Sequence, residues 1–156
     1  MGWSIIFVAL FFIPPLKAQA TKEPVMRILI GNENKVKFRA DGVKSIFITG
    51  ITSNQRRVNS LKLIHSDGEV KYAINNTKDK WFKLPNDFNL IIKSNDKRGI
   101  WFNNRRYAGE LRASLNNKQL QIINHLKLEK YLKSVVGSEM PKEFPLAALQ
   151  AQAIAA

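Results

Sequence analysis

The fold class is decided by residues 128–156, which read LEKYLKSVVGSEMPKEFPLAALQAQAIAA. The first half of this stretch carries apolar residues at positions i, i+4, i+7 and i+8, the spacing of one helix face. They are Leu128, Leu132, Val135 and Val136. Gly137-Ser138 predicts the end of this helix, since glycine commonly follows the last helical turn.

A second helix is predicted to begin at Pro145, because proline is favoured in a first helical turn. Its alanine-rich body has high helix propensity. Its predicted buried face consists of Leu146, Leu149, Ala153 and Ile154. The sequence stops inside this helix without a capping residue, so we expect a fragment of a longer reading frame.

Upstream of residue 128 the sequence predicts strands. Residues 35–40 alternate polar and apolar side chains, which is the period of a half-buried strand. Ser66-Asp67-Gly68-Glu69 predicts a hairpin turn, because Asp-Gly accepts the positive φ angles of a tight turn. A second hairpin is predicted over residues 105–124, with its turn at Asn116-Asn117-Lys118. The predicted strands cover residues 25–30, 35–40, 45–49, 61–64, 70–74, 88–93, 107–115 and 119–124, with a loop at 75–85. The predicted fold class is α+β: a β-rich N-terminal region followed by two packed helices, truncated in the second helix.

The N-terminus predicts export. Residues 3–13 form an apolar run that is short for a membrane span, which needs about 20 residues. Pro14-Pro15 and then Ala18-Gln19-Ala20 follow, a pattern typical of a signal peptide with its cleavage site. We expect residues 1–20 to be this signal peptide. An uncleaved membrane anchor through residues 3–13 is the alternative. In both cases the protein is placed in the periplasm, in the cell wall or on the outer side of the cytoplasmic membrane.

The chain is strongly basic, with 25 Lys and Arg against 12 Asp and Glu. Without residues 1–20 it keeps 24 basic and 12 acidic residues, a net charge of +12. Such a field favours anionic partners. The candidates are nucleic acid, anionic lipid and a polyanionic cell-wall polymer. Of the three, export argues most strongly against nucleic acid, and the scattered basic residues fit a broadly positive surface. A solubilising surface is the alternative. Cysteine is absent, so no disulfide or thiolate metal site is expected.

Glu139 is the main candidate for chemistry. It lies between the two predicted helices, before Met140-Pro141, where proline restricts the turn. A carboxyl group partly withdrawn from water there would suit general-acid catalysis. The alternative is an ordinary loop or cap residue. His65 and His125 lack partners at metal-ligand spacing, so we expect structural or surface roles, no metal site and no cofactor.

Three segments resemble the stage II sporulation protein D (SpoIID) family, which includes the amidase enhancers called LytB. LEKYLKSVVGSEMP at 128–141 follows the pattern Leu-Glu-x-Tyr-Leu-x-x-Val-Val-x-x-Glu-Met-Pro. FPLAALQAQAIAA at 144–156 contains Ala-Leu-x-Ala-Gln-Ala-x-Ala-Ala, and YAGEL at 107–111 is similar to the family's Tyr-x-Gly strand. The resemblance divides the chain into a β-rich region, 21–100, and the incomplete N-terminal part of a SpoIID/LytB-like domain, 101–156.

The resemblance implies a lytic transglycosylase that cleaves peptidoglycan glycan strands already stripped of their stem peptides. It implies that Glu139 is the catalytic acid and base, and leaves the substrate-binding residues unknown. The alternative is a non-catalytic amidase enhancer that binds peptidoglycan and has a cell-wall amidase as its partner. A secreted β-rich binding protein is a third reading. The family pattern continues with Arg-Thr-Tyr and a longer C-terminal half, so we expect residues 1–156 alone to be inactive.

Overall fold

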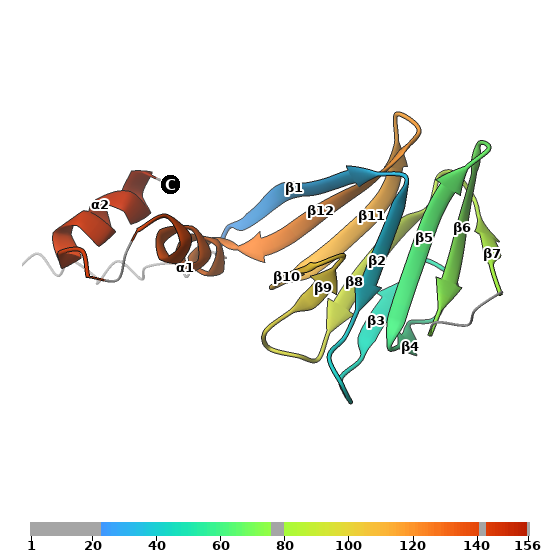
Figure 1. The fold of residues 1–156 in the computed structure, drawn as a ribbon, viewed down its shortest axis with the longest axis horizontal. Helices are drawn as coiled ribbons and strands as arrows, with labels where there is room; N and C mark the ends of the chain where they lie inside the picture. The colour runs from blue at the N-terminus through green and yellow to red at the C-terminus, as the bar shows by residue number, and fades with distance from the viewer. Residues whose placement is uncertain (1–22, 76–79, 141–142, 156) are drawn as a thin grey trace, which may run out of the picture.

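The computed structural model describes residues 23–75, 80–140 and 143–155. Two antiparallel six-stranded sheets form a sandwich, and two helices follow at its end (Figure 1). The strands are β1 (Val25–Glu33), β2 (Lys35–Arg39), β3 (Ile46–Thr49), β4 (Arg56–Val58), β5 (Ser60–Ser66), β6 (Glu69–Ile74), β7 (Phe82–Leu84), β8 (Asn89–Ser94), β9 (Ile100–Phe102), β10 (Arg105–Tyr107), β11 (Glu110–Asn116) and β12 (Gln119–Lys127). The helices are α1 (Leu128–Glu139) and α2 (Leu146–Ala155). The predicted α+β class is confirmed.

The two sheets enclose one core. The first has the strand order β1-β12-β11-β8-β3-β4, and the second has β10-β9-β2-β5-β6-β7. Strands such as β2, β8 and β12 alternate buried apolar residues with more exposed ones, as a strand with one buried face must. The largest fully buried side chains are Phe38, Ile46, Ile48, Leu61, Leu63, Leu90, Ile92, Ile100, Leu111, Leu120 and Ile122.

Both predicted hairpins are present. Asp67 and Gly68 join β5 to β6 with φ angles of 53° and 74°. Asn117 and Lys118 join β11 to β12 with φ angles of 49° and 60°. Two consecutive residues of positive φ give the turn twist that suits an antiparallel pair. Turn chemistry thus fixed the register of both pairs.

The sequence predicted that the first strand ends before Gly31, and this prediction is wrong. β1 continues to Glu33 through an irregularity between Leu29 and Gly31 in its pairing with β12. A Cβ on Gly31 would lie 2.6 Å from the Phe102 ring, so this glycine lets the strand pass close to the core. Glycine here permits a bulge and a close approach rather than a turn.

Short strands escaped the sequence prediction. β4, β7, β9 and β10 have three residues each, too few for a period to be visible. β7 lies within the predicted loop at 75–85. Tyr107, predicted as the start of the second hairpin, ends β10 in the other sheet. The chain changes sheets at Gly109, whose φ of 90° and 2.5 Å Cβ approach to the His125 carbonyl oxygen exclude other residues.

The sandwich is continuous across the boundary proposed at residue 100. β12 lies between β1 and β11, and β11 pairs with β8. The division into 21–100 and 101–156 therefore stays a prediction about sequence similarity, while the packing joins residues from both sides of it.

The signal peptide or anchor predicted for residues 1–20 lies outside the described residues. Within the described part of the chain, neither helix combines the length and apolarity needed to cross a membrane.

Helix α1 is tied to the sandwich at its first turn. The Leu128 amide donates to the Pro24 carbonyl oxygen over 2.9 Å. The Glu23 carboxylate accepts from the Glu129 amide at 3.3 Å and pairs with Lys127 Nζ at 2.9 Å. The hydrogen bond from Lys127 lowers the pKa of Glu23. A carboxylate at this helix end also complements the helix dipole, so the start of β1 fixes the start of α1.

An acid-sensitive contact lies between β8 and β9. The buried Asp96 carboxylate accepts from Arg98 Nη2 at 2.8 Å and from Arg98 Nε at 3.1 Å. These bonds lower the pKa of Asp96 from 3.8 to about 2. A lowered folded-state pKa stabilises the fold above the unfolded pKa and loses that effect as the pH falls towards 2.

We therefore expect Asp96→Asn to lower the melting temperature near pH 6, with a difference from wild type that shrinks between pH 4 and pH 2. Thermal unfolding followed by circular dichroism across this range measures it. A difference that stays constant with pH would show that the ionised form of Asp96 does not stabilise the fold.

Candidate functional site

The end of α1 positions Glu139. The sequence predicted that the helix ends at Gly137-Ser138, and this prediction is wrong: α1 continues through both residues to Glu139. Gly137 keeps a helical backbone, whereas Met140 is extended at φ −126° and ψ 132°. A proline follows Met140 in the sequence and disfavours the helical region for the residue before it. Proline, rather than glycine, ends α1, so Glu139 is its last residue instead of part of a separate turn.

Gly137 is dispensable for packing, because a Cβ there would meet no atom within 4 Å. Glycine inside a helix costs up to about 1 kcal/mol relative to alanine. We expect Gly137→Ala to stabilise α1 by roughly 0.5–1 kcal/mol and to slow amide hydrogen exchange in α1 by about two- to fivefold. Faster exchange in this variant would show that the glycine meets a structural requirement.

Gln152 is the partner of Glu139. The Gln152 Nε2 donates to Glu139 Oε2 over 2.7 Å, which links the end of α1 to the second turn of α2. Glu139 is exposed in the structure, contrary to the withdrawal from water that the sequence suggested. The carboxyl group is therefore oriented by an amide and accessible from solvent. Gln152 lies in the alanine-rich string that resembles the family pattern, but the sequence analysis assigned it no role. Its polar side chain in an otherwise apolar helix was the signal that could have identified it.

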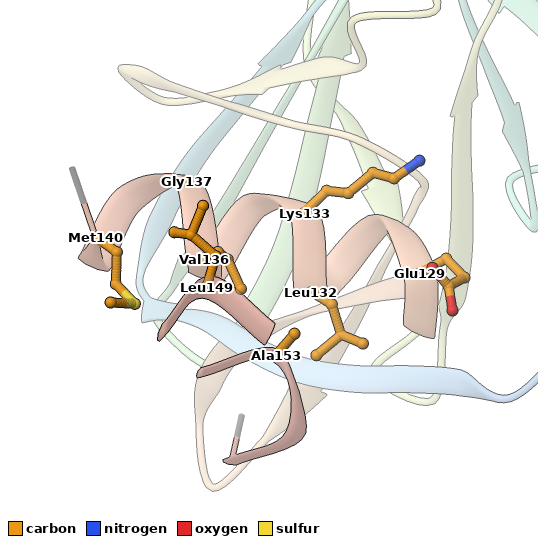
Figure 2. Close-up of a pocket in the computed structure, with 8 residues that line it drawn as sticks. All are labelled: Glu129, Leu132, Lys133, Val136, Gly137, Met140, Leu149 and Ala153. Carbon is orange, nitrogen blue, oxygen red and sulfur yellow. The ribbon is translucent and has the colours of Figure 1, made fainter. Parts of the chain in front are cut away.

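An apolar groove runs beside this carboxylate between the helices (Figure 2). Its cavity measures about 550 Å³ and combines mostly apolar side chains with two charged ones. Its lining residues are Glu129, Leu132, Lys133, Val136, Gly137, Met140, Leu149 and Ala153. Gly137 and Met140 flank Glu139 in the sequence, so the groove passes close to the end of α1.

The predicted buried face of α2 is not buried. Leu146 is 69% exposed and Ile154 is 88% exposed, while Leu149 and Ala153 are half-buried in the groove. The apolar stripe of α1 is likewise half-buried. The helices contact each other, but the described residues do not cover their outer apolar surfaces. The spacing found the correct helix faces and overestimated their burial, since periodicity does not show how much protein packs on a face.

The two histidines lie in strands of the sandwich rather than beside Glu139. His65 is in β5 opposite Val70. His125 is in β12, where burial lowers its pKa and its Nε2 has no hydrogen-bond partner in the described residues. Among the described residues, no three acidic or histidine side chains gather as metal ligands would. At the end of α1, Glu139 offers an accessible carboxyl group, which can donate or accept a proton.

Comparison with known proteins finds a family model that is similar to the helix pair. Residues 116–156, which include all of β12 and both helices, match the model of the family described as Stage II sporulation protein (SpoIID). The chain is also 38% identical over 67 residues to an uncharacterized protein of Brachyspira hyodysenteriae. That match covers 43% of this chain and 18% of the relative's length. No solved structure matches the chain.

The matched region contains both groups of the hydrogen bond between the helices, Glu139 and Gln152. It indicates a function related to sporulation or the cell wall. The similarity to the SpoIID family thus covers the last quarter of the chain, residues 116–156.

Proposed function

We propose that the full-length protein is an exported lytic transglycosylase that cleaves peptidoglycan glycan strands stripped of their stem peptides, with Glu139 as its acid and base. The observation that carries this proposal is the position of Glu139. Within the segment that matches the family, its carboxyl group lies at the end of α1, accessible to solvent and held by Gln152 at 2.7 Å. A polymer can approach such a group, and the hydrogen bond from the Gln152 amide limits the orientations of the carboxyl group.

One carboxyl group is enough for this reaction. Glu139 first gives its proton to the oxygen that joins N-acetylmuramic acid to N-acetylglucosamine, and the bond from muramic C1 to that oxygen breaks. The muramic C6 hydroxyl oxygen then bonds to C1, and its proton passes to the Glu139 carboxylate. The product carries a 1,6-anhydro ring and no water is consumed. Hydrolytic glycosidases instead employ two carboxylates about 5–10 Å apart.

The charge of the chain supports the same substrate. Each muramic unit of a stripped strand exposes a lactyl carboxylate, and the chain has a net charge of +13. Long-range attraction raises the local concentration of such a polyanion and the rate of encounter. The apolar groove beside Glu139 offers space for part of a sugar chain, with Lys133 at its edge.

The test is cleavage by the protein from the complete reading frame. Stripped glycan strands and peptide-bearing peptidoglycan are incubated with it in parallel, and released fragments are separated by chromatography. We expect cleavage of the stripped strands and little release from the peptide-bearing polymer. Absence of cleavage in both samples, with the folded protein present, would contradict the enzymatic proposal.

A non-catalytic amidase enhancer is the second candidate, because the helix pair exposes apolar side chains that suit a partner protein. Phe144, Leu146 and Ile154 are 46%, 69% and 88% exposed. In that case a cell-wall amidase would release stem peptides faster when the protein is added, and Glu139→Gln would stimulate it as well as wild type. Stimulation that requires the Glu139 carboxyl group would speak against this second function.

A further inference from the structure

The outer face of the second sheet presents a row of cations. In β2, Val36 and Phe38 point into the core, so Lys35, Lys37 and Arg39 lie on the opposite face. Together with Lys62 of β5 and the loop after β9 they line a surface hollow of about 570 Å³. We name it the basic hollow, and its residues are Lys35, Val36, Lys37, Arg39, Lys62, Asn103 and Asn104. The strands β2 and β5, which carry most of these residues, lie away from α1 and α2 (Figure 1).

The centre of the basic hollow holds two lysines in an unfavourable arrangement. Lys37 and Lys62 are direct cross-strand partners, and both are half-buried. Like charges directly opposite each other destabilise a sheet. No acidic side chain of the described residues forms an ion pair with Lys35, Lys37 or Lys62. An anion bound between these amines would relieve the repulsion that the fold leaves in place.

The rim of the basic hollow is pre-organised. Arg39 lies 4.3 Å from the Trp101 ring centre and bonds to Asp41 Oδ1 at 3.2 Å. Trp101 Nε1 donates to the same carboxylate oxygen at 2.6 Å, and Arg106 lies 4.7 Å from the ring centre. The guanidinium groups of Arg39 and Arg106 lie over the Trp101 ring. Trp101 therefore orients Arg39 and does not offer a free ring face on which a sugar could stack. Recognition at this face therefore relies on charge.

The opposite rim supplies amide groups. Asn103 Oδ1 accepts from the Lys37 amide at 2.9 Å, and Asn103 Nδ2 donates to the Glu33 carboxylate at 3.1 Å. These bonds fix the loop that carries the exposed Asn104. The Asn104 side chain offers a hydrogen-bond donor and an acceptor, which suits sugar hydroxyl and acetamido groups. Cations flanked by an amide fit a carboxylated sugar chain better than a bare polyphosphate.

We propose that the basic hollow is a second binding site, separate from Glu139, which holds the carboxylate groups of an anionic wall glycan. This inference rests on the proposed function for the identity of the polymer. It assigns the sandwich the role of retaining the strand while the helix pair acts elsewhere on it. Since a glycan strand repeats its carboxylate along its length, one strand can supply ligands to both places.

The test measures the binding of end-labelled, peptide-free glycan strands to the full chain by fluorescence anisotropy. Lys37→Gln/Lys62→Gln should weaken binding about tenfold, equivalent to about 1.4 kcal/mol, and should reduce its salt dependence. The matched control is Lys44→Gln/Lys97→Gln, which removes the same charge from exposed loops and should change affinity less than about twofold. Thermal unfolding confirms that both variants are folded; the first should be at least as stable as wild type because it loses a repulsion.

Three outcomes overturn the inference: equal weakening in both double variants, unchanged binding in Lys37→Gln/Lys62→Gln, or equal affinity for strands whose lactyl carboxylates have been reduced to alcohols. Tighter binding of a phosphate-backbone wall polymer than of glycan would also overturn it. Glu139→Gln should bind strands like wild type. If strands bind through Lys37 and Lys62 but the full-length protein does not cleave them, only the proposed enzymatic function is contradicted. If the protein cleaves strands but Lys37→Gln/Lys62→Gln binds them like wild type, only the inference about the basic hollow is contradicted.

Discussion

Glu139→Gln in the full-length protein is expected to reduce the rate of glycan-strand cleavage by at least about 100-fold, because general acid–base catalysis contributes roughly 10²–10⁴-fold. The substitution preserves size and removes the exchangeable proton. Its amide oxygen can still accept from Gln152 Nε2, which in the wild type donates over 2.7 Å. The local arrangement of α1 and α2 should therefore persist while proton transfer stops. The rate of fragment release under single-turnover conditions measures the effect.

The matched control for this variant is Glu143→Gln, which removes the same charge from a nearby exposed position. We expect its cleavage rate to stay within about twofold of wild type, since a change at one exposed charge has small effects. If Glu139→Gln cleaves as fast as Glu143→Gln, another group carries the proton and the assignment of Glu139 fails.

Phe38→Ala is expected to have the largest effect on stability, lowering the free energy of unfolding by about 3–5 kcal/mol. The Phe38 side chain is 0% exposed, and its ring centre lies 5.6 Å from that of Phe102. It also holds β2, which lies between β5 and β9 in the second sheet. The free energy of unfolding of a domain is only about 5–15 kcal/mol in total. We therefore expect the melting temperature to fall by roughly 10–25 °C.

Val43→Ala serves as the control for this truncation. Val43 is 92% exposed, so the same kind of shortening at this position leaves no cavity. Denaturant unfolding should show a change within about 0.5 kcal/mol. A loss for Phe38→Ala as small as that for Val43→Ala would show that the stability of the sandwich does not depend on the packing of this buried ring.

The strands with clear alternation could be predicted from the sequence, while the arrangement of the sheets could not. Lys35–Arg39 shows a period of two, and Asp67-Gly68 marks the turn between β5 and β6, because both signals are local. The partner of each strand is set by distant residues: β12 pairs with β1 across nearly the whole chain. Three-residue strands such as β9 depend on this context and have no signature of their own.

The candidate site was predicted in part. The resemblance singled out Glu139, and the structure places it beside Gln152. The end of α1 was predicted wrongly because both Gly137 and Pro141 are signals for a helix end. The helix continues through Gly137 and ends before the proline. The burial of the α2 face was overestimated because spacing identifies a face without identifying what covers it.

The basic hollow was beyond prediction from the sequence, although the net charge of +13 was evident. The relevant fact is the register that puts Lys37 opposite Lys62, and register between β2 and β5 emerges only from the folded sheet. The amino-acid composition predicts a positive electrostatic field, whereas the pairing of β2 with β5 determines where on the surface the positive charges gather.

The most direct test of the central claim is the mass of the products that the full-length protein forms from stripped strands in water enriched in ¹⁸O. Intramolecular attack by the muramic C6 hydroxyl predicts anhydro-muramic ends that contain no ¹⁸O, and these ends should disappear in Glu139→Gln. Reducing ends that carry ¹⁸O would show that water attacks C1, and would contradict a transglycosylase in which one carboxyl group, Glu139, transfers the proton in both directions.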